Sequence, residues 1–168
     1  ASTDGEKVVH PTKTYVDEKE VEAALAITEL QEFADRLVDS LSGGQRQRAW
    51  IAMTLAQNTQ ILLLDEPATF LDLVHQIEVL DLLYELKQKE NRTIVMVLHE
   101  LNQTCRYGDH LIAMKAGEVC AQGSPPRVMT ETLVKEVFGL DCRIVSDPVA
   151  GTPLCIPIGR KVSVKEMV

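Results

Sequence analysis

The chain has 168 residues, of which 45% are hydrophobic and 25% are charged, a composition typical of one or two soluble globular domains. Its 25 acidic and 17 basic residues give a net charge of -8, which disfavours a protein that binds the nucleic-acid backbone. The longest aliphatic run, residues 61–64, is far too short to span a bilayer. The four cysteines form no C-x-x-C pair, so we expect free thiols in a reducing cytoplasm rather than a zinc site or a disulfide scaffold.

The first third of the chain is predicted to be a polar start followed by two helices. Residues 1–16 are polar and aperiodic, and we expect a disordered or non-native start there. Residues 17–60 form the next part. A capping-box-like start and apolar residues at helical spacing predict one helix over 17–34. A second helix is predicted over 43–57, with Ser42 as its N-cap.

Residues 61–168 alternate between predicted strands and helices. An apolar strand over 61–64, an amphipathic helix over 71–90 and an apolar strand over 93–98 predict a βαβ unit with two parallel strands. Because both strands are apolar on both faces, we expect the sheet to be buried on both sides. The remaining predicted elements are a short helix from 101, a hairpin of strands 110–115 and 118–121, a helix over 134–138, and extended pieces at 142–145 and 154–158.

A glycine-rich turn precedes the second predicted helix and reads Leu41-Ser42-Gly43-Gly44-Gln45. Two glycines and a serine at a helix N-terminus expose unpaired N–H groups, and the helix dipole favours negative charge there. The turn therefore suits an anion such as a phosphate group. An ordinary loop with a serine cap is the alternative.

Acidic residues and a histidine follow the two parallel strands at the edge where α/β folds place their ligands. Asp65 and Glu66 end the first strand and His99 ends the second. Neighbouring strand residues point to opposite faces, so the two carboxylates cannot form a facing acid–base pair. We expect Asp65 to hold Mg²⁺ through water and Glu66 to polarise an attacking water. A solvated strand end and a structural histidine are the alternatives.

Together these motifs resemble those of the ABC-type ATPases, in the same order along the chain. Residues 41–48 are similar to the signature motif, and residues 61–66 to the Walker B strand with its catalytic glutamate. Residues 69–72 are similar to the D-loop, and His99 to the switch histidine. The resemblance implies an α/β fold, namely a partial P-loop NTPase core with a parallel sheet and part of the helical subdomain.

The resemblance also implies roles for individual residues. Glu66 and His99 would be catalytic, and Asp65 would hold Mg²⁺. The residues implied to contact ATP are Ser42, Gly43, Gly44, Gln45 and Asp72. In the family's head-to-tail dimer, the signature residues touch the γ-phosphate held by the P-loop of the second subunit.

Three stretches, 70–77, 97–102 and 151–157, narrow the resemblance to importers for iron–siderophore complexes. Cobalamin or haem import is the alternative within the family. The implied partners are transmembrane permease subunits, a second ATPase subunit and, indirectly, a substrate-binding protein, but no nucleic acid. The implied location is the cytoplasmic face of the cell membrane.

The Walker A pattern G-x-x-x-x-G-K-[ST] does not occur in this sequence. We therefore expect the chain to be the C-terminal part of an ABC ATPase and to be inactive alone, although its signature motif could complete the site of a partner. A non-catalytic interaction module is the alternative. In the family, strand 93–98 pairs with the P-loop strand, so we expect its free edge to be covered by a second copy or by a strand from 141–158.

Overall fold

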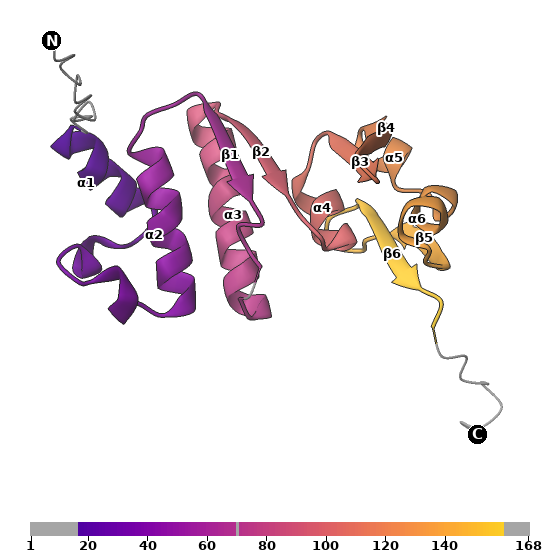
Figure 1. The fold of residues 1–168 in the computed structure, drawn as a ribbon, viewed down its shortest axis with the longest axis horizontal. Helices are drawn as coiled ribbons and strands as arrows, with labels where there is room; N and C mark the ends of the chain where they lie inside the picture. Colours follow the sequence, from indigo (N-terminus) through magenta and orange to yellow (C-terminus); the bar gives the residue numbers. More distant parts are fainter. Residues whose placement is uncertain (1–16, 70, 160–168) are drawn as a thin grey trace, which may run out of the picture. The chain divides into compact units, whose positions relative to one another are not determined.

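The structure is a computed structural model that describes residues 17–69 and 71–159 (Figure 1). The chain divides into two compact units, Ala1–Leu62 and Leu63–Val168. The start expected to be disordered or non-native, residues 1–16, lies outside the described residues. Within the described ranges, no helix is both long enough and apolar enough to cross a membrane.

The described part of the first unit contains the two predicted helices. Its elements are the helices α1 (Glu18–Ile27) and α2 (Gly43–Leu55), which contact each other, and the 3-10 turns η1 (Gln31–Phe33) and η2 (Val38–Ser40) between them. Helix α1 ends before the predicted residue 34 because Glu29 has a φ of 56°, which an α-helix does not permit. The Thr28 hydroxyl donates a hydrogen bond of 2.8 Å to the carbonyl of Ala24 at this end.

A βαβ unit follows, made of β1 (Ile61–Asp65), α3 (Leu73–Glu90) and β2 (Thr93–Val97). The two strands form a two-stranded sheet, and their arrows run in the same direction in Figure 1, so the predicted parallel pair is confirmed. Asp72 caps the start of α3, and Asn91 ends it in the left-handed conformation with a φ of 52°.

The prediction that this sheet is buried on both faces is wrong for the described residues. Leu62 is only 1% exposed, whereas its neighbour Leu63 is 72% exposed and Val95 on β2 is 52% exposed. Since successive strand residues point to opposite faces, one face is covered and the other is open within residues 17–69 and 71–159. An apolar sequence on both faces therefore shows which surface can be buried, not what buries it.

The tail of the chain also differs from its prediction. Strands β5 (Cys142–Ser146) and β6 (Pro153–Pro157) pair with each other in an antiparallel hairpin, with Ile144 opposite Cys155. Within the described residues β2 pairs with β1 alone, so the expectation that a strand from 141–158 covers the free edge of β2 is wrong. In the hairpin, β5 and β6 satisfy each other's backbone hydrogen-bonding groups, and the side chains of Cys142 and Cys155 are buried. Pairing of either strand with β2 would lose these interactions.

The remaining elements of the second unit are α4 (Leu101–Tyr107), β3 (Leu111–Lys115), β4 (Glu118–Gly123), α5 (Pro125–Val128) and α6 (Glu131–Phe138). Strands β3 and β4 form the predicted hairpin, and Ala116 and Gly117 in its turn have positive φ angles of 49° and 84°. The core of this region is formed by Cys105, Leu111, Val128, Met129, Val134, Cys142 and Cys155.

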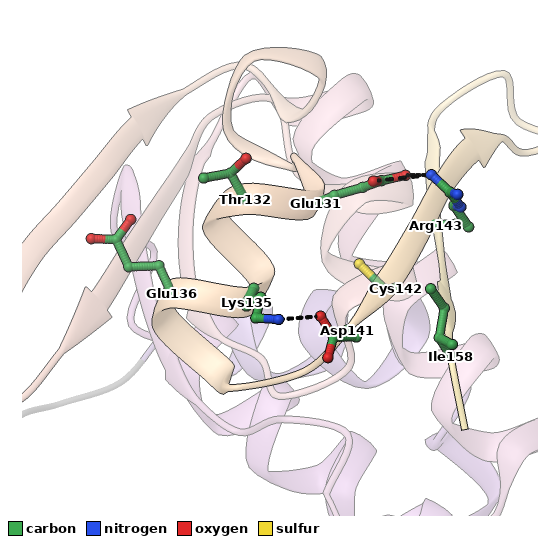
Figure 2. Close-up of a pocket in the computed structure, with 8 residues that line it drawn as sticks. All are labelled: Glu131, Thr132, Lys135, Glu136, Asp141, Cys142, Arg143 and Ile158. Carbon is green, nitrogen blue, oxygen red and sulfur yellow. Dashed lines mark hydrogen bonds and ion pairs between the residues drawn. The ribbon is translucent and has the colours of Figure 1, made fainter. Parts of the chain in front are cut away.

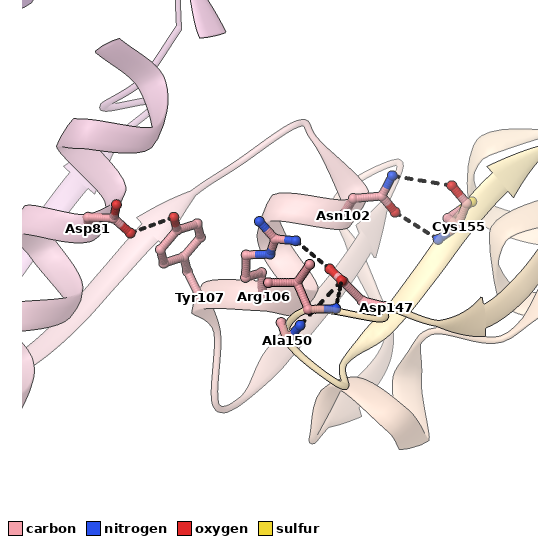
Figure 3. A network of polar contacts seen from close by, with 8 residues as sticks. Asp81, Asn102, Arg106, Tyr107, Asp147, Ala150 and Cys155 are labelled. Carbon is pink, nitrogen blue, oxygen red and sulfur yellow. Dashed lines mark hydrogen bonds and ion pairs between the residues drawn. The ribbon is translucent and has the colours of Figure 1, made fainter. Parts of the chain in front are cut away.

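Polar side chains of α4 bind the elements beside it (Figure 3). The Asn102 amide accepts from the N–H of Cys155 at 2.7 Å and donates to its carbonyl at 3.2 Å, so it pairs with both backbone groups of that strand residue. One turn later, Arg106 donates to the buried carboxylate of Asp147 at 2.5 Å. These contacts hold α4 on the β5–β6 hairpin.

The Arg106–Asp147 pair predicts a pH-dependent stability. Arg106, followed by the backbone N–H groups of Val149 and Ala150, lowers the pKa of Asp147 below its ordinary value of 3.8. A carboxylate with a lowered folded-state pKa stabilises the fold fully above its unfolded pKa, and this stabilisation is lost as the pH falls through the folded-state pKa. We expect Asp147→Asn to lower the melting temperature by several degrees at pH 7, with a gap to wild type that narrows below about pH 4.

The control is Asp141→Asn, which removes the ion pair with Lys135. The two side chains of that pair are 61% and 66% exposed, so the melting temperature should hardly change at any pH. Thermal unfolding followed by circular dichroism between pH 3 and pH 8 makes the comparison. A gap for Asp147→Asn that stays constant down to pH 3 would contradict the role of the charged pair.

Candidate functional site

The glycine-rich turn forms the N-terminus of α2 in the first unit. The Ser42 hydroxyl oxygen accepts from the N–H of Gln45 at 3.3 Å, and the Gln45 side chain accepts from the N–H of Ser42 at 3.0 Å. This capping box fixes the first turn of the helix. It does not use the N–H groups of Gly43 and Gly44, which occupy the first two helical positions. Gly43 is exposed and Gly44 is buried, so the exposed backbone donor at the positive end of the helix dipole is that of Gly43, which suits an anionic group.

The carboxyl end of β1 carries the two predicted acidic residues in the second unit. Asp65 is the last strand residue; it is exposed, and its carboxylate has no hydrogen-bond or ion-pair partner among the described residues. Glu66 follows with a φ of 49°. A residue other than glycine is strained in this region, and such strain concentrates at functional sites. The left-handed conformation ends the strand and turns the chain after Glu66.

Glu66 and His99 are brought together from the ends of adjacent strands. The distance between Glu66 Oε1 and His99 Nε2 is 2.5 Å. The hydrogen bond to Glu66 raises the pKa of His99, and the charges of Glu66, Asp65 and Glu100 act in the same direction. The hydrogen bonds from His99 and then from Thr69 lower the pKa of Glu66. The two side chains therefore form an ion pair whenever the histidine is protonated.

Asp72 has a structural partner in addition to its predicted role. Its Oδ1 atom accepts from the backbone N–H of His75 at 3.0 Å and lies 2.7 Å from the Nδ1 atom of the same residue. The backbone bond and then the ring lower the pKa of Asp72. The N-cap of α3 is thus a charged aspartate, and the predicted contact of Asp72 with ATP stays a prediction.

The structure places the predicted residues in two groups. Asp65, Glu66, Asp72 and His99 belong to the second unit, whereas Ser42, Gly43, Gly44 and Gln45 belong to the first. Sequence reasoning missed the contact between Asp72 and the ring of His75, although an aspartate just before a helix is a recognisable N-cap. Within residues 17–69 and 71–159, no three His, Cys, Asp or Glu side chains are grouped to hold a metal ion.

A second candidate is the hollow beside α6, with a volume of about 520 Å³ (Figure 2). Four of its five charged side chains form two ion pairs: Lys135 lies 2.6 Å from Asp141, and Arg143 lies 3.4 Å from Glu131. None of the residues singled out in the sequence lines this hollow. Since both basic side chains of this hollow are already paired with acidic ones in exposed ion pairs, we assign no function to it.

Comparison with known proteins shows the family to which the chain belongs. Residues 3–69 match the family model for ABC transporters. The Bacillus subtilis protein named "Probable siderophore transport system ATP-binding protein YusV" is 63% identical over 144 residues, which make up 86% of this chain and 52% of that protein. The chain belongs to the ABC transporter ATP-binding family.

Two further comparisons support membership of the ABC family. The ferric enterobactin transport ATP-binding protein FepC of Escherichia coli is 55% identical over 86% of this chain and 53% of its own length. A metal-chelate type ABC transporter solved in an inward-facing conformation has a TM-score of 0.78 at 28% identity, over 92% of this chain and 61% of that one. The chain spans about half the length of the curated relatives it matches. Its fold is a partial ABC ATPase fold, as the motifs implied.

Proposed function

We propose that this chain supplies the signature, Walker B, D-loop and switch regions of an ATP-hydrolysing subunit in an ABC importer for iron–siderophore complexes. The observation that carries the proposal is the 2.5 Å contact between Glu66 and His99 at the carboxyl ends of β1 and β2. The siderophore cargo is supported by the names of YusV and FepC.

Each side chain at the end of the sheet has a distinct role in this proposal. Glu66 polarises the attacking water, and His99 orients the carboxylate of Glu66 through the contact between them. Exposed Asp65 suits Mg²⁺ held through water. Mg²⁺ is usually bound by only one or two carboxylates together with substrate phosphates, so the donor set fits this ion without a cluster of protein ligands. Mg²⁺ supplies charge neutralisation to the phosphates when bound.

The signature turn acts on a second subunit. The N–H groups of Gly43 and Gly44 and the hydroxyl of Ser42 contact the γ-phosphate of ATP held in the P-loop of that subunit, while Gln45 keeps the turn in place through the capping box. The proposed assembly is a head-to-tail pair of ATPase subunits on permease subunits at the cytoplasmic face of the membrane. A substrate-binding protein would deliver the cargo without touching this chain.

Iron uptake in cells tests the proposed function. We define the YusV chimera as this chain joined to the part of YusV that it does not match. In a Bacillus subtilis strain lacking YusV, the chimera should restore growth on ferric siderophore as sole iron source, and a chimera with Glu66→Gln should not. If the chimera restored only cobalamin or haem uptake, the cargo would be cobalamin or haem and not an iron–siderophore complex. Failure to restore any uptake by a chimera that is present at the membrane would overturn the proposal.

We predict that the chain alone neither binds ATP tightly nor hydrolyses it. The backbone N–H groups and the lysine of a P-loop supply most phosphate contacts in the ground state, and this sequence contains no such motif. Isothermal titration calorimetry on the purified chain should therefore show no micromolar affinity for Mg²⁺-ATP. Micromolar binding without a partner would contradict the prediction. If no ATP turnover is seen even when a P-loop-bearing partner is added, the chain is better explained as a non-catalytic interaction module.

A further inference from the structure

One glutamine connects the D-loop to the helix that follows the switch histidine. Gln76 in the first turn of α3 donates from Nε2 to the carbonyl of Leu71 at 2.9 Å. Gln103 of α4 donates from its own Nε2 to Oε1 of Gln76 at 3.0 Å. Leu71 directly precedes Asp72, and Gln103 lies four residues after His99. Both glutamines are half-buried, so water competes only weakly for these bonds.

We call the two hydrogen bonds from Gln103 to Gln76 and from Gln76 to Leu71 the relay. The chemistry of the groups at its two ends decides which group donates in each bond. The carbonyl of Leu71 can only accept, so the end of Gln76 that faces it must be the NH₂ group. That leaves Oε1 of Gln76 facing Gln103, which must then donate. A carboxylate at either position would place two acceptors against each other. The relay therefore needs a donor and an acceptor on residue 76, and a donor on residue 103.

The switch histidine itself reaches Thr69 of the D-loop through Glu66. Among the hydrogen bonds described for α4, the relay alone reaches the D-loop, and the others hold α4 elsewhere. Asn102 and Arg106 bind α4 to the β5–β6 hairpin. Tyr107 donates to Asp81 of α3 at 2.7 Å, which ties the two helices together more than one turn beyond Gln76 (Figure 3). The relay is thus the contact through which the position of α4 is transmitted to the backbone beside Asp72.

We propose that Gln76 and Gln103 are positioning residues that set the D-loop backbone at Leu71 and Asp72 relative to the switch segment that carries His99. The inference rests on the proposed function, because the geometry matters for catalysis only if both segments act in ATP hydrolysis. Neither glutamine touches the reacting atoms in this proposal. Their effect passes through Asp72 and His99.

The first test uses the chain itself and measures amide hydrogen exchange at His75, whose N–H donates to Asp72. Gln103→Glu replaces the donor by an acceptor, and it should speed exchange at His75 by about three- to tenfold, the equivalent of one hydrogen bond. Gln103→Lys keeps a donor and should leave the exchange rate near that of wild type. Tyr107→Phe is the matched control, since it removes an α3–α4 hydrogen bond that does not reach the D-loop.

The second test measures ATP turnover in the YusV chimera. Gln103→Glu should lower kcat about tenfold with an unchanged KM for ATP, and Gln103→Lys and Tyr107→Phe should keep most of kcat. The inference is overturned if Gln103→Glu changes His75 exchange no more than Tyr107→Phe, or if it speeds exchange while kcat stays at the wild-type value. If the wild-type chimera shows no ATP turnover, the proposed function and the catalytic part of this inference are overturned. The exchange rates at His75 would still show whether Gln103 positions the D-loop backbone.

Discussion

Replacing Glu66 by glutamine is expected to lower ATP turnover of the YusV chimera by about 10²- to 10⁴-fold, the usual contribution of a general base. Glutamine keeps the size of the side chain and an oxygen that can accept from His99 at the observed contact. It cannot take a proton from water. ATP binding should therefore be unchanged, because the phosphate contacts are made elsewhere. Turnover under saturating Mg²⁺-ATP and nucleotide affinity by calorimetry separate the two effects.

The neighbouring carboxylate supplies the control for this prediction. Asp65→Asn should weaken nucleotide binding in the presence of Mg²⁺ and leave binding in its absence unchanged, since Asp65 is proposed to act through the ion. Wild-type turnover in the Glu66→Gln chimera would show that Glu66 is not the residue that polarises water. A loss of nucleotide binding in that variant would assign Glu66 to the phosphate site instead.

The βαβ unit and the helical start were predictable from local sequence, because hydrophobic spacing and caps act over a few residues. The start of α3 was predicted two residues too early, at 71, because Asp72 is its N-cap and the helix begins at Leu73. The end of α1 was not predictable in this way. Its position depends on the left-handed conformation of Glu29, and no residue near that point signals a helix stop as glycine or proline would.

Burial of the sheet was predicted less well than its topology. Leu63 and Val95 are as apolar as Leu62, yet they are 72% and 52% exposed, against 1% for Leu62. Hydrophobicity states a preference for burial, whereas actual burial depends on which other segments are packed on that face. The sequence pattern contains the first property and not the second.

In the candidate site, too, some features follow from local sequence patterns and others depend on tertiary packing. The position of Glu66 and His99 at one sheet edge was anticipated because parallel strands bring their carboxyl ends together, whereas their 2.5 Å contact is known only from the structure. The relay through Gln76 and Gln103 was not anticipated, since glutamine is a good helix former and common on helix surfaces. Only the packing of α4 beside α3 shows that both amides are paired.

The signature turn allows a prediction in which function and stability change in opposite directions. Gly43 is exposed at the first position of α2, where the helix dipole favours a negative charge. Gly43→Asp should therefore leave thermal stability unchanged or raise it, by about 0.3–1 kcal/mol. The same carboxylate would repel a phosphate group about 4 Å away by about 4 kcal/mol at an effective dielectric constant near 20, or about a thousandfold in affinity.

We expect the chain to stimulate ATP turnover of a P-loop-bearing ABC ATPase subunit, and Gly43→Asp to abolish that stimulation. Gly43→Ala is the neutral control and should keep it, because alanine leaves the backbone N–H group in place. Glu66→Gln in this chain should also keep it, since the partner supplies its own catalytic glutamate to the shared site. Full stimulation by Gly43→Asp would show that the turn does not face phosphate. Loss of stimulation in Gly43→Ala as well would point to steric exclusion rather than to charge.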